Sequence, residues 1–249
     1  MVILKTKDQI DNIRKSCKIV AYVLDTLKKE AKAGATTSYL NNLAETLCLD
    51  KGCRPGFKNY KGFPYSLCCS KNNVVVHGFP DDIPLEDGDI LSLDFGVVLN
   101  GWWGDAAITI PIGKASDKTS KLIEATMGCL SCGIGMAKVN NRIGDISEAI
   151  QSKAESYGFA PAKEFVGHGV GRNLHEEPQI PNFGAKNDGV LIKPGAVLAI
   201  EPIICIGSGE TLTLSDGWNV ITKDGNLSAH FEHTIVVTGD GVEILTILD

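Results

Sequence analysis

The sequence predicts an α+β fold of two related halves, each with two helices followed by antiparallel strands. Two observations favour this fold. The spacing from Gly88 to Asp94 in one apolar segment recurs from Gly195 to Glu201 in another. Each of these acids is followed by a further strand that carries a second carboxylate near its start. Because the order and the spacing both repeat, we expect the halves to share one continuous sheet with helices on the outside.

The first half begins with a predicted amphipathic helix. Thr6 and Gln9 have the spacing of a capping box, and apolar residues recur at steps of three and four up to Leu27. A glycine-containing turn then leads to a second helix. We expect Thr37 to be the N-cap of this helix and Gly52 to mark its end.

Strands follow these helices. Small and β-branched residues bounded by Gly, Pro and Asn predict short strands at about 66–70 and 74–76. Two longer strands come next, one carrying Asp94 and the other Asp105. The dipeptide Asn100–Gly101 lies between them and favours a tight hairpin turn.

The second half repeats this order. We expect helices at about 116–137 and 145–157, separated by a turn at Asn140 and Asn141. Strands are predicted at 160–166, 190–201, 232–237 and 242–248. No Ser/Gly linker separates the halves, so residues 1–249 are expected to form a single domain with pseudo-symmetric halves of about 1–113 and 114–249.

Composition narrows the class of protein. The chain has 249 residues, 43% of them hydrophobic and 22% charged, as in ordinary globular proteins. The net charge is -6 and Lys and Arg are scattered, which disfavours direct nucleic-acid binding. No apolar run approaches the ~18 residues of a membrane span, and no signal peptide is recognisable, so we expect a cytoplasmic protein without membrane contact.

The cysteines do not indicate a disulfide framework or a zinc site. There are eight, and without a secretory context we interpret them as reduced thiols. Cys129 and Cys132 form a C-x-x-C motif, but no second pair or neighbouring histidine completes a four-ligand site. We therefore expect them to be small apolar residues of a helix.

Four carboxylates in repeat-related positions suggest a dinuclear metal site. Asp94 and Glu201 lie inside apolar runs, and Asp105 and Glu232 begin the strands that follow. Burying a carboxylate is costly unless it is paired or bound to a metal. Two ions about 3.5–4 Å apart need bridging carboxylates. The alternative is that these acids lie at exposed strand ends or pair with Lys or Arg.

Histidines complete the candidate site. His77 and His168 are each followed by glycine, and His168 would add an imidazole that suits Mn, Fe, Co or Zn better than Mg or Ca. His175 lies seven residues later in a glycine-rich segment, so the pair is not the H-E-x-x-H motif of a helix. His230 and His233 could equally be ordinary core or surface residues.

Six segments of the chain form a recognisable set, namely Gly62–Ser66, Asn73–Gly78, Gly88–Gly96, Gly167–Arg172, Leu174–Pro178 and Ser228–Thr234. Together these segments resemble type I methionine aminopeptidases. The resemblance runs from residue 6 to about residue 245 and includes no long N-terminal extension, as in the short bacterial or organellar form. It implies the pita-bread fold, with a curved antiparallel sheet and the metal site in its concave face.

The resemblance also implies roles for individual residues. The ligands of two divalent ions would be Asp94, Asp105, His168, Glu201 and Glu232, with Asp105 and Glu232 bridging. Glu201 would also accept a proton from the attacking water. His175 would bind the scissile carbonyl oxygen, and His77 would contact the scissile amide and assist the leaving amine. One ion would bind the free α-amino group, which restricts cleavage to the first residue.

By the same resemblance, Tyr60, Phe63, Cys68 and Trp218 would line the methionine pocket, with Phe57 and Leu174 nearby. Ordinary core packing is the alternative for these residues. This chain departs from many family members at three positions, which have cysteine in place of Phe57, tyrosine in place of Phe95 and glutamine in place of His230. A structural monovalent cation is also implied near Asn72, Val74 and Ser228.

The predicted function is metal-dependent hydrolytic removal of the N-terminal methionine from nascent proteins and peptides with a small second residue. The expected partners are nascent N-termini at the ribosome, and the expected state is a monomer. One alternative is a proline-directed peptidase of the same fold, which would share the five ligands but carry an extra N-terminal domain and other pocket residues. Another is a non-catalytic peptide-binding protein, which would lose ligands.

Overall fold

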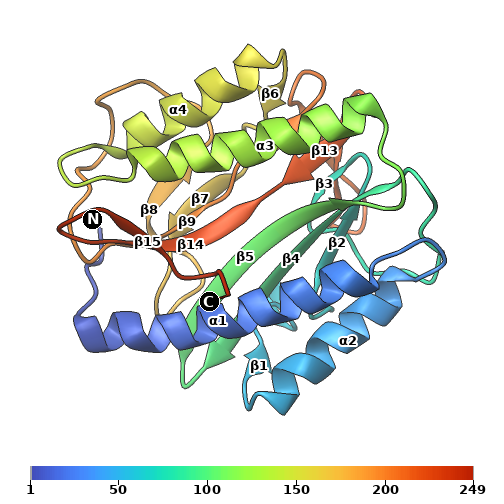
Figure 1. Ribbon diagram of the computed structural model, residues 1–249, viewed down its shortest axis with the longest axis horizontal. Helices are drawn as coiled ribbons and strands as arrows, with labels where there is room; N and C mark the ends of the chain where they lie inside the picture. Colours follow the sequence, from blue (N-terminus) through green and yellow to red (C-terminus); the bar gives the residue numbers. More distant parts are fainter. Residues whose placement is uncertain (1, 249) are drawn as a thin grey trace.

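The computed structural model describes residues 2–248, within which four α-helices pack on a large antiparallel sheet. The helices form two pairs, α1 (Lys7–Glu30) with α2 (Thr37–Asp50) and α3 (Asp117–Met136) with α4 (Ile143–Ser156). Both pairs cover the same face of the sheet, one pair along each half of the chain (Figure 1). The α+β class and the helix-helix-strand order predicted for both halves are confirmed.

In the described residues, nine strands form the large sheet in the order β1-β4-β5-β14-β9-β7-β8, with β2 paired to β4 and β15 paired to β14. The pairing of β5 with β14 joins the two halves, so the sheet is continuous across the molecule. The strands are β1 (Arg54–Pro55), β2 (Cys68–Lys71), β4 (Ile90–Leu99), β5 (Trp102–Pro111), β7 (Val166–Gly169), β8 (Glu176–Pro181), β9 (Val197–Ile200), β14 (Glu232–Val237) and β15 (Val242–Ile244).

Two smaller antiparallel sheets of three strands each lie within residues 2–248. The first has the order β13-β10-β6 and the second β11-β12-β3. Their strands are β3 (Val74–Val76), β6 (Ala160–Pro161), β10 (Ile203–Cys205), β11 (Thr211–Thr213), β12 (Val220–Thr222) and β13 (Ser228–His230). A short 3-10 helix, η1 (Tyr60–Gly62), precedes β2.

The alternation of side chains along β4 separates the core from the candidate site. Leu91, Leu93, Phe95 and Val97 point toward α1 and α2 and are completely buried there. Asp94 occupies an intervening position, so its side chain points to the opposite face of the sheet. The helices therefore fill one face with apolar side chains and leave the other face to the polar residues.

Helix boundaries agree with the sequence to within about two residues, since α4 begins at Ile143 and not at 145, and one predicted cap is wrong. Thr6 forms the expected capping box with Gln9. The N-cap of α2 is Thr36, whose side chain accepts a hydrogen bond from the backbone N–H of Tyr39, so the prediction of Thr37 was wrong by one residue. The Thr37 hydroxyl is instead used in a tertiary contact, because it accepts a hydrogen bond from the backbone N–H of Asp81.

Several strands are shorter than predicted. The segment 160–166 divides between two sheets, since β6 pairs with β10 while β7 begins only at Val166. The segment 190–201 becomes regular only at Val197, because Pro194 has no N–H to donate and Gly195 has a φ of +88°. The last strand, β15, ends at Ile244, and the expected strand 66–70 begins at Cys68.

The cysteines behave as expected. All eight are free thiols, and all except Cys132 are buried. Cys129 lies on α3 inside the apolar core, as predicted for a small apolar residue.

No helix in the described part of the chain combines the length and apolar character that a bilayer crossing requires.

Candidate metal centre

Strand register brings the two carboxylates of the first half together. In the hairpin β4–β5, Asp94 lies opposite Ala107 and Asp105 lies opposite Gly96. The two acids are therefore diagonal neighbours on one face of the sheet. The hairpin turns at Asn100 and Gly101, which both have positive φ values, as the sequence predicted for this dipeptide.

Register also brings the second-half residues to this face. Glu232 pairs with Ala107, which places it in the same row across the sheet as Asp94. His233 pairs with Ile200, so continuing the ladder by one residue sets Glu201 opposite Glu232. His168 pairs with Ala199 on the adjacent strand.

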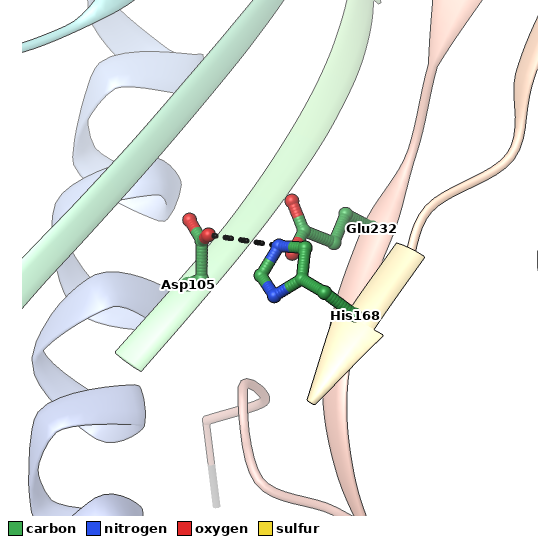
Figure 2. Close-up of side chains that lie close together, drawn as sticks. All are labelled: Asp105, His168 and Glu232. Atoms are coloured by element: carbon green, nitrogen blue, oxygen red, sulfur yellow. Dashed lines mark ion pairs between the residues drawn. The ribbon is translucent and has the colours of Figure 1, made fainter. Parts of the chain in front are cut away.

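The side chains converge closely. Atoms of Asp105, His168 and Glu232 suitable for metal binding all lie within 4.8 Å of one another (Figure 2). The His168 Nε2 atom lies 3.9 Å from Asp105 Oδ2 and 3.4 Å from Glu201 Oε1. These separations fit donors that surround a common ion, since metal–nitrogen and metal–oxygen bonds are each about 2 Å long.

Three of these carboxylates each have one buried oxygen without a protein partner. Asp105 and Glu232 are 4% and 2% exposed. Asp94 Oδ1, Asp105 Oδ1 and Glu232 Oε1 have no hydrogen-bond partner within the described chain. Within residues 2–248, these acids therefore neither lie at exposed strand ends nor pair with Lys or Arg. An oxygen-rich, buried and unpaired cluster fits a divalent cation.

The pKa values express the same electrostatic conflict. Burial raises the pKa of Asp94 to about 7. Burial and then the neighbouring carboxylates raise the pKa values of Asp105, Glu201 and Glu232 well above their ordinary range. A bound cation would remove this penalty by favouring the ionised form of each group.

His168 is held in the orientation a ligand needs. Its Nδ1 lies 3.0 Å from the carbonyl oxygen of Gly169, which directs Nε2 toward the carboxylates. Burial and then nearby His175 lower its pKa to about 4, which favours the neutral ring. Glycine is required on either side, because a Cβ at Gly167 would lie 2.4 Å from the Ala199 carbonyl oxygen and one at Gly169 would lie 2.5 Å from that of Glu177.

Two further histidines flank the carboxylates. The rings of His175 and His168 have centroids 4.4 Å apart, and His175 Nδ1 is hydrogen-bonded to the Tyr60 hydroxyl at 3.0 Å. His77 lies edge-on to Trp218 and Phe165 and has a φ of +58°. Burial lowers the pKa of both histidines, and for His77 the value is about 4.

A cavity of about 250 Å³ joins this cluster to an apolar wall. The cavity is lined by the four residues predicted for the methionine pocket, Tyr60, Phe63, Cys68 and Trp218, and by the two predicted to lie nearby, Phe57 and Leu174. Phe63 and Trp218 meet edge to face with centroids 5.1 Å apart. The same residues also belong to an apolar cluster under the cavity, so core packing and pocket lining are both correct descriptions.

Sequence reasoning missed part of the lining. Lys61, Val76 and Phe165 also face the cavity, and His230, left open in the sequence, does so too. Phe165 could have been predicted to line the cavity from its position three residues before His168, on the segment that leads into β7. His233 lies elsewhere, with its Nδ1 2.9 Å from the Thr246 hydroxyl oxygen.

Comparison with known proteins identifies the family. The family model described as metallopeptidase family M24 matches residues 11–239. A methionine aminopeptidase of Clostridium perfringens is 47% identical over 248 residues, which cover 100% of both chains. The crystal structure of methionine aminopeptidase from Thermotoga maritima superposes with a TM-score of 0.98 at 40% identity and 100% coverage of both chains.

The chain belongs to metallopeptidase family M24. Within the family it groups with the methionine aminopeptidases, as the sequence motifs predicted. A prolidase from Pyrococcus furiosus shares the pita-bread fold with a TM-score of 0.81 at 23% identity, and the chain covers 66% of that protein. At this identity the prolidase supports the shared fold alone.

This chain departs from the methionine aminopeptidase pattern at three positions, and the residues at two of them, Phe57 and His230, line the cavity. Phe57 packs on Gly96, where a Cβ would lie 2.7 Å from its ring, and it lines the cavity wall. His230 lies beside the carboxylates. Phe95 is completely buried on the helix face of the sheet, so this substitution acts on core packing.

Proposed function

We propose that this member of the M24 family hydrolyses the N-terminal methionine from nascent proteins and peptides, with a preference for a small second residue. The observation that carries the proposal is the cavity in which an apolar wall meets a buried carboxylate–imidazole cluster. An apolar, adaptable wall suits the methionine side chain. The polar end suits the amino group and the scissile bond.

We propose Asp94, Asp105, His168, Glu201 and Glu232 as ligands of two divalent ions, with Asp105 and Glu232 bridging. Unpartnered oxygens on Asp94, Asp105 and Glu232 support this set, as does the inward-facing Nε2 of His168. Mixed oxygen and nitrogen donors favour Mn, Fe, Co or Zn. When bound, such ions act as Lewis acids and make water nucleophilic near neutral pH.

Glu201 is proposed as the group that accepts the proton of the attacking water. Its side chain is 13% exposed and lines the cavity beside the other proposed ligands. Its Oε1 faces His168 while Oε2 faces His230. A base in this position acts on the nucleophile without exposure to bulk solvent.

His175 and His77 are proposed to act on the substrate amide. His175 is oriented by Tyr60 and would donate a hydrogen bond to the carbonyl oxygen as negative charge develops there. His77 lies against Trp218 on the cavity wall and would contact the scissile amide nitrogen. The positive φ of His77 sets its backbone in a conformation that a non-glycine residue rarely adopts.

Restriction to a small second residue is proposed to be steric. Three bulky aromatic side chains, Tyr60, Phe63 and Trp218, line the cavity of about 250 Å³. We propose that these rings limit the room for the second residue of the peptide. A bulky second side chain would therefore clash before the scissile bond reached the carboxylates.

The decisive experiment uses protein stripped of metal by a chelator and then given Co²⁺, Mn²⁺, Fe²⁺ or Zn²⁺ singly. A Met-Gly-Ser peptide should release free methionine only after metal is restored. Met-Leu-Ser tests the steric limit, and Gly-Pro and Ala-Pro peptides test proline-directed cleavage. Release of methionine without metal, or preferential cleavage before proline, would contradict the proposed function.

Other features of the proposal concern the whole chain. We propose a single catalytic domain over residues 1–249, with halves that meet near residue 113, acting in the cytoplasm as a monomer on N-termini at the ribosome. A structural monovalent cation is proposed near Asn72, Val74 and Ser228. The buried Ser228 hydroxyl has no hydrogen-bond partner among residues 2–248, which supports a cation there. Sedimentation with and without ribosomes would test the assembly state and the partner.

A further inference from the structure

His230 is fixed beside the metal centre by its backbone. It ends β13, where it pairs with Ile203 of β10. Its backbone N–H donates to the Thr109 hydroxyl at 2.9 Å, and that hydroxyl donates to its carbonyl oxygen at 2.6 Å. The side chain is 3% exposed and lines the cavity. A strand from the other half of the molecule thus holds this imidazole in place.

The Nε2 atom of His230 is buried and has no hydrogen-bond partner in the described chain. It lies 3.7 Å from Glu201 Oε2 and 4.0 Å from Glu232 Oε2. Both distances exceed the usual length of a hydrogen bond. Two donors that bind one ion at about 2 Å each lie up to about 4 Å apart, so the distances fit a shared ion.

His168 has the same relation to the carboxylates. Its Nε2 lies 3.4 Å from Glu201 Oε1 and 3.9 Å from Asp105 Oδ2. The two oxygens of Glu201 therefore face two different imidazoles, one on each side. His230 therefore resembles His168 in its burial and in the distance of its Nε2 from a carboxylate oxygen of Glu201.

We propose that His230 is an additional ligand of the metal centre and binds through Nε2 an ion that Glu201 and Glu232 also hold. The inference rests on the proposed metal dependence and is independent of the peptide substrate. A second nitrogen donor shifts the site toward Fe, Co and Zn relative to Mg and Mn. Glutamine at this position could hydrogen-bond Glu201 but would supply no imidazole.

X-ray absorption of protein loaded with two equivalents of Co²⁺ tests this directly, because imidazole rings give characteristic outer-shell scattering. We expect an average of one imidazole per ion in the wild type, from His168 and His230 together. His230→Gln should halve that count while keeping an N–H group that can donate to Glu201. By calorimetry, the same variant should bind Co²⁺ at least about 10-fold more weakly.

His233→Gln is the matched control. It lies three residues away, but its imidazole is hydrogen-bonded to Thr246 and does not line the cavity. This variant should keep the wild-type imidazole count and Co²⁺ affinity. Circular dichroism of both variants checks folding, and the wild-type count decides the question even where a variant does not fold.

Two outcomes separate this inference from the proposed function. A wild-type average of half an imidazole per ion, or an unchanged count in His230→Gln, would overturn the ligand role of His230 alone. Failure of the wild-type chain to bind Co²⁺ would overturn the metal-dependent function together with it. A halved count in His230→Gln with an unchanged His233→Gln would support the inference.

Discussion

The two halves of the molecule contribute to the same candidate metal centre with different architectures. Asp94 and Asp105 come from one hairpin of two ten-residue strands whose pairing is continuous from Ile90 to Leu99. The second half uses shorter strands, and the pairing of β7 with β8 is irregular around His168. A regular hairpin supplies only oxygen donors, whereas the irregular half supplies imidazole and the proposed base.

This difference shows how a repeated framework can hold unequal chemistry. Asp94 and Glu201 are equivalent in the repeat, yet Glu201 lies one residue beyond the end of β9. The longer glutamate side chain leaves its carboxylate between two imidazoles at the cavity. The carboxyl group of Asp94 faces no imidazole nitrogen within 4.0 Å in the described chain. We therefore expect substitutions of Asp94 and of Glu201 to impair different steps, metal binding in the first case and turnover in the second.

The largest effect is expected for Glu201→Gln. Removing the proton acceptor should lower kcat by roughly 10²–10⁴-fold while much of the metal remains bound, because the other ligands persist. Asp94→Asn, its repeat counterpart, should instead weaken metal binding and recover activity at high metal concentration. Peptide turnover together with metal content per chain measures both. Full turnover in Glu201→Gln would show that the base lies elsewhere.

His175→Ala is expected to have the next largest effect. Loss of the hydrogen bond to the developing oxyanion should lower kcat by roughly 10²–10³-fold and change KM little. Tyr60→Phe removes only the hydroxyl that orients His175, so its kcat should fall less. Steady-state kinetics on one methionyl peptide compares the two variants. Equal kcat in His175→Ala and wild type would remove the proposed role of the imidazole.

The sequence predicted the regular half well. The Asn100–Gly101 dipeptide predicted the hairpin, and the observed register of that hairpin places Asp94 and Asp105 on the face away from α1 and α2. The helices were predictable because apolar residues recur at helical spacing and Thr6 supplies a recognisable cap. In each case, interactions between residues near in sequence determine the structure.

The remaining features depend on contacts between distant segments. Thr37 is not the N-cap of α2, because its hydroxyl accepts a hydrogen bond from the backbone N–H of Asp81, 44 residues away. The segment 160–166 divides between sheets according to which strands lie beside it. The position of His230 is set by Thr109 of β5, a contact that no local pattern reports. The internal repeat predicted the four candidate carboxylates, and the family resemblance supplied the roles that are proposed for them.

A pH dependence should follow from the buried carboxylates of the metal-free protein. Their pKa values are raised in the folded state, to about 7 for Asp94 and well above the ordinary range for Asp105, Glu201 and Glu232. The folded chain therefore binds more protons than the unfolded chain, and stability is lost as pH rises through the folded pKa values. All five histidines have lowered pKa values, so their opposing effect is confined to pH values below about 6.5.

Between about pH 6.5 and 8.5 we thus expect the free energy of unfolding of the metal-free protein to fall by on the order of 1 kcal/mol per pH unit. Bound Co²⁺ should abolish this fall, since the ionised carboxylates are then the favoured form. Thermal unfolding with chelator and with Co²⁺ at several pH values measures the difference. A metal-free protein that gains stability over this range would contradict the raised pKa values.

The smallest effects are expected for two glycine substitutions that compare how the helices pack on the sheet in the two halves. A Cβ at Gly104 of β5 would lie 2.6 Å from the backbone nitrogen of Cys17 in α1, so Gly104→Ala must displace the helix backbone. We expect it to cost about 1–3 kcal/mol of stability. A Cβ at Gly133 of α3 would meet only side chains, Ile150 at 3.0 Å and Ile200 at 3.2 Å. Alanine there also gains up to about 1 kcal/mol of helix propensity, so Gly133→Ala should change stability by less than about 1 kcal/mol.

Urea unfolding of the Co²⁺-loaded variants would rank the two glycines. Because Gly104 directly precedes Asp105, Gly104→Ala should also weaken Co²⁺ binding, whereas Gly133→Ala should leave it unchanged. Equal stability losses in the two variants would mean that α1 and α3 approach the sheet with similar freedom. The contrast between a backbone contact in one half and an adjustable side-chain contact in the other would then be wrong.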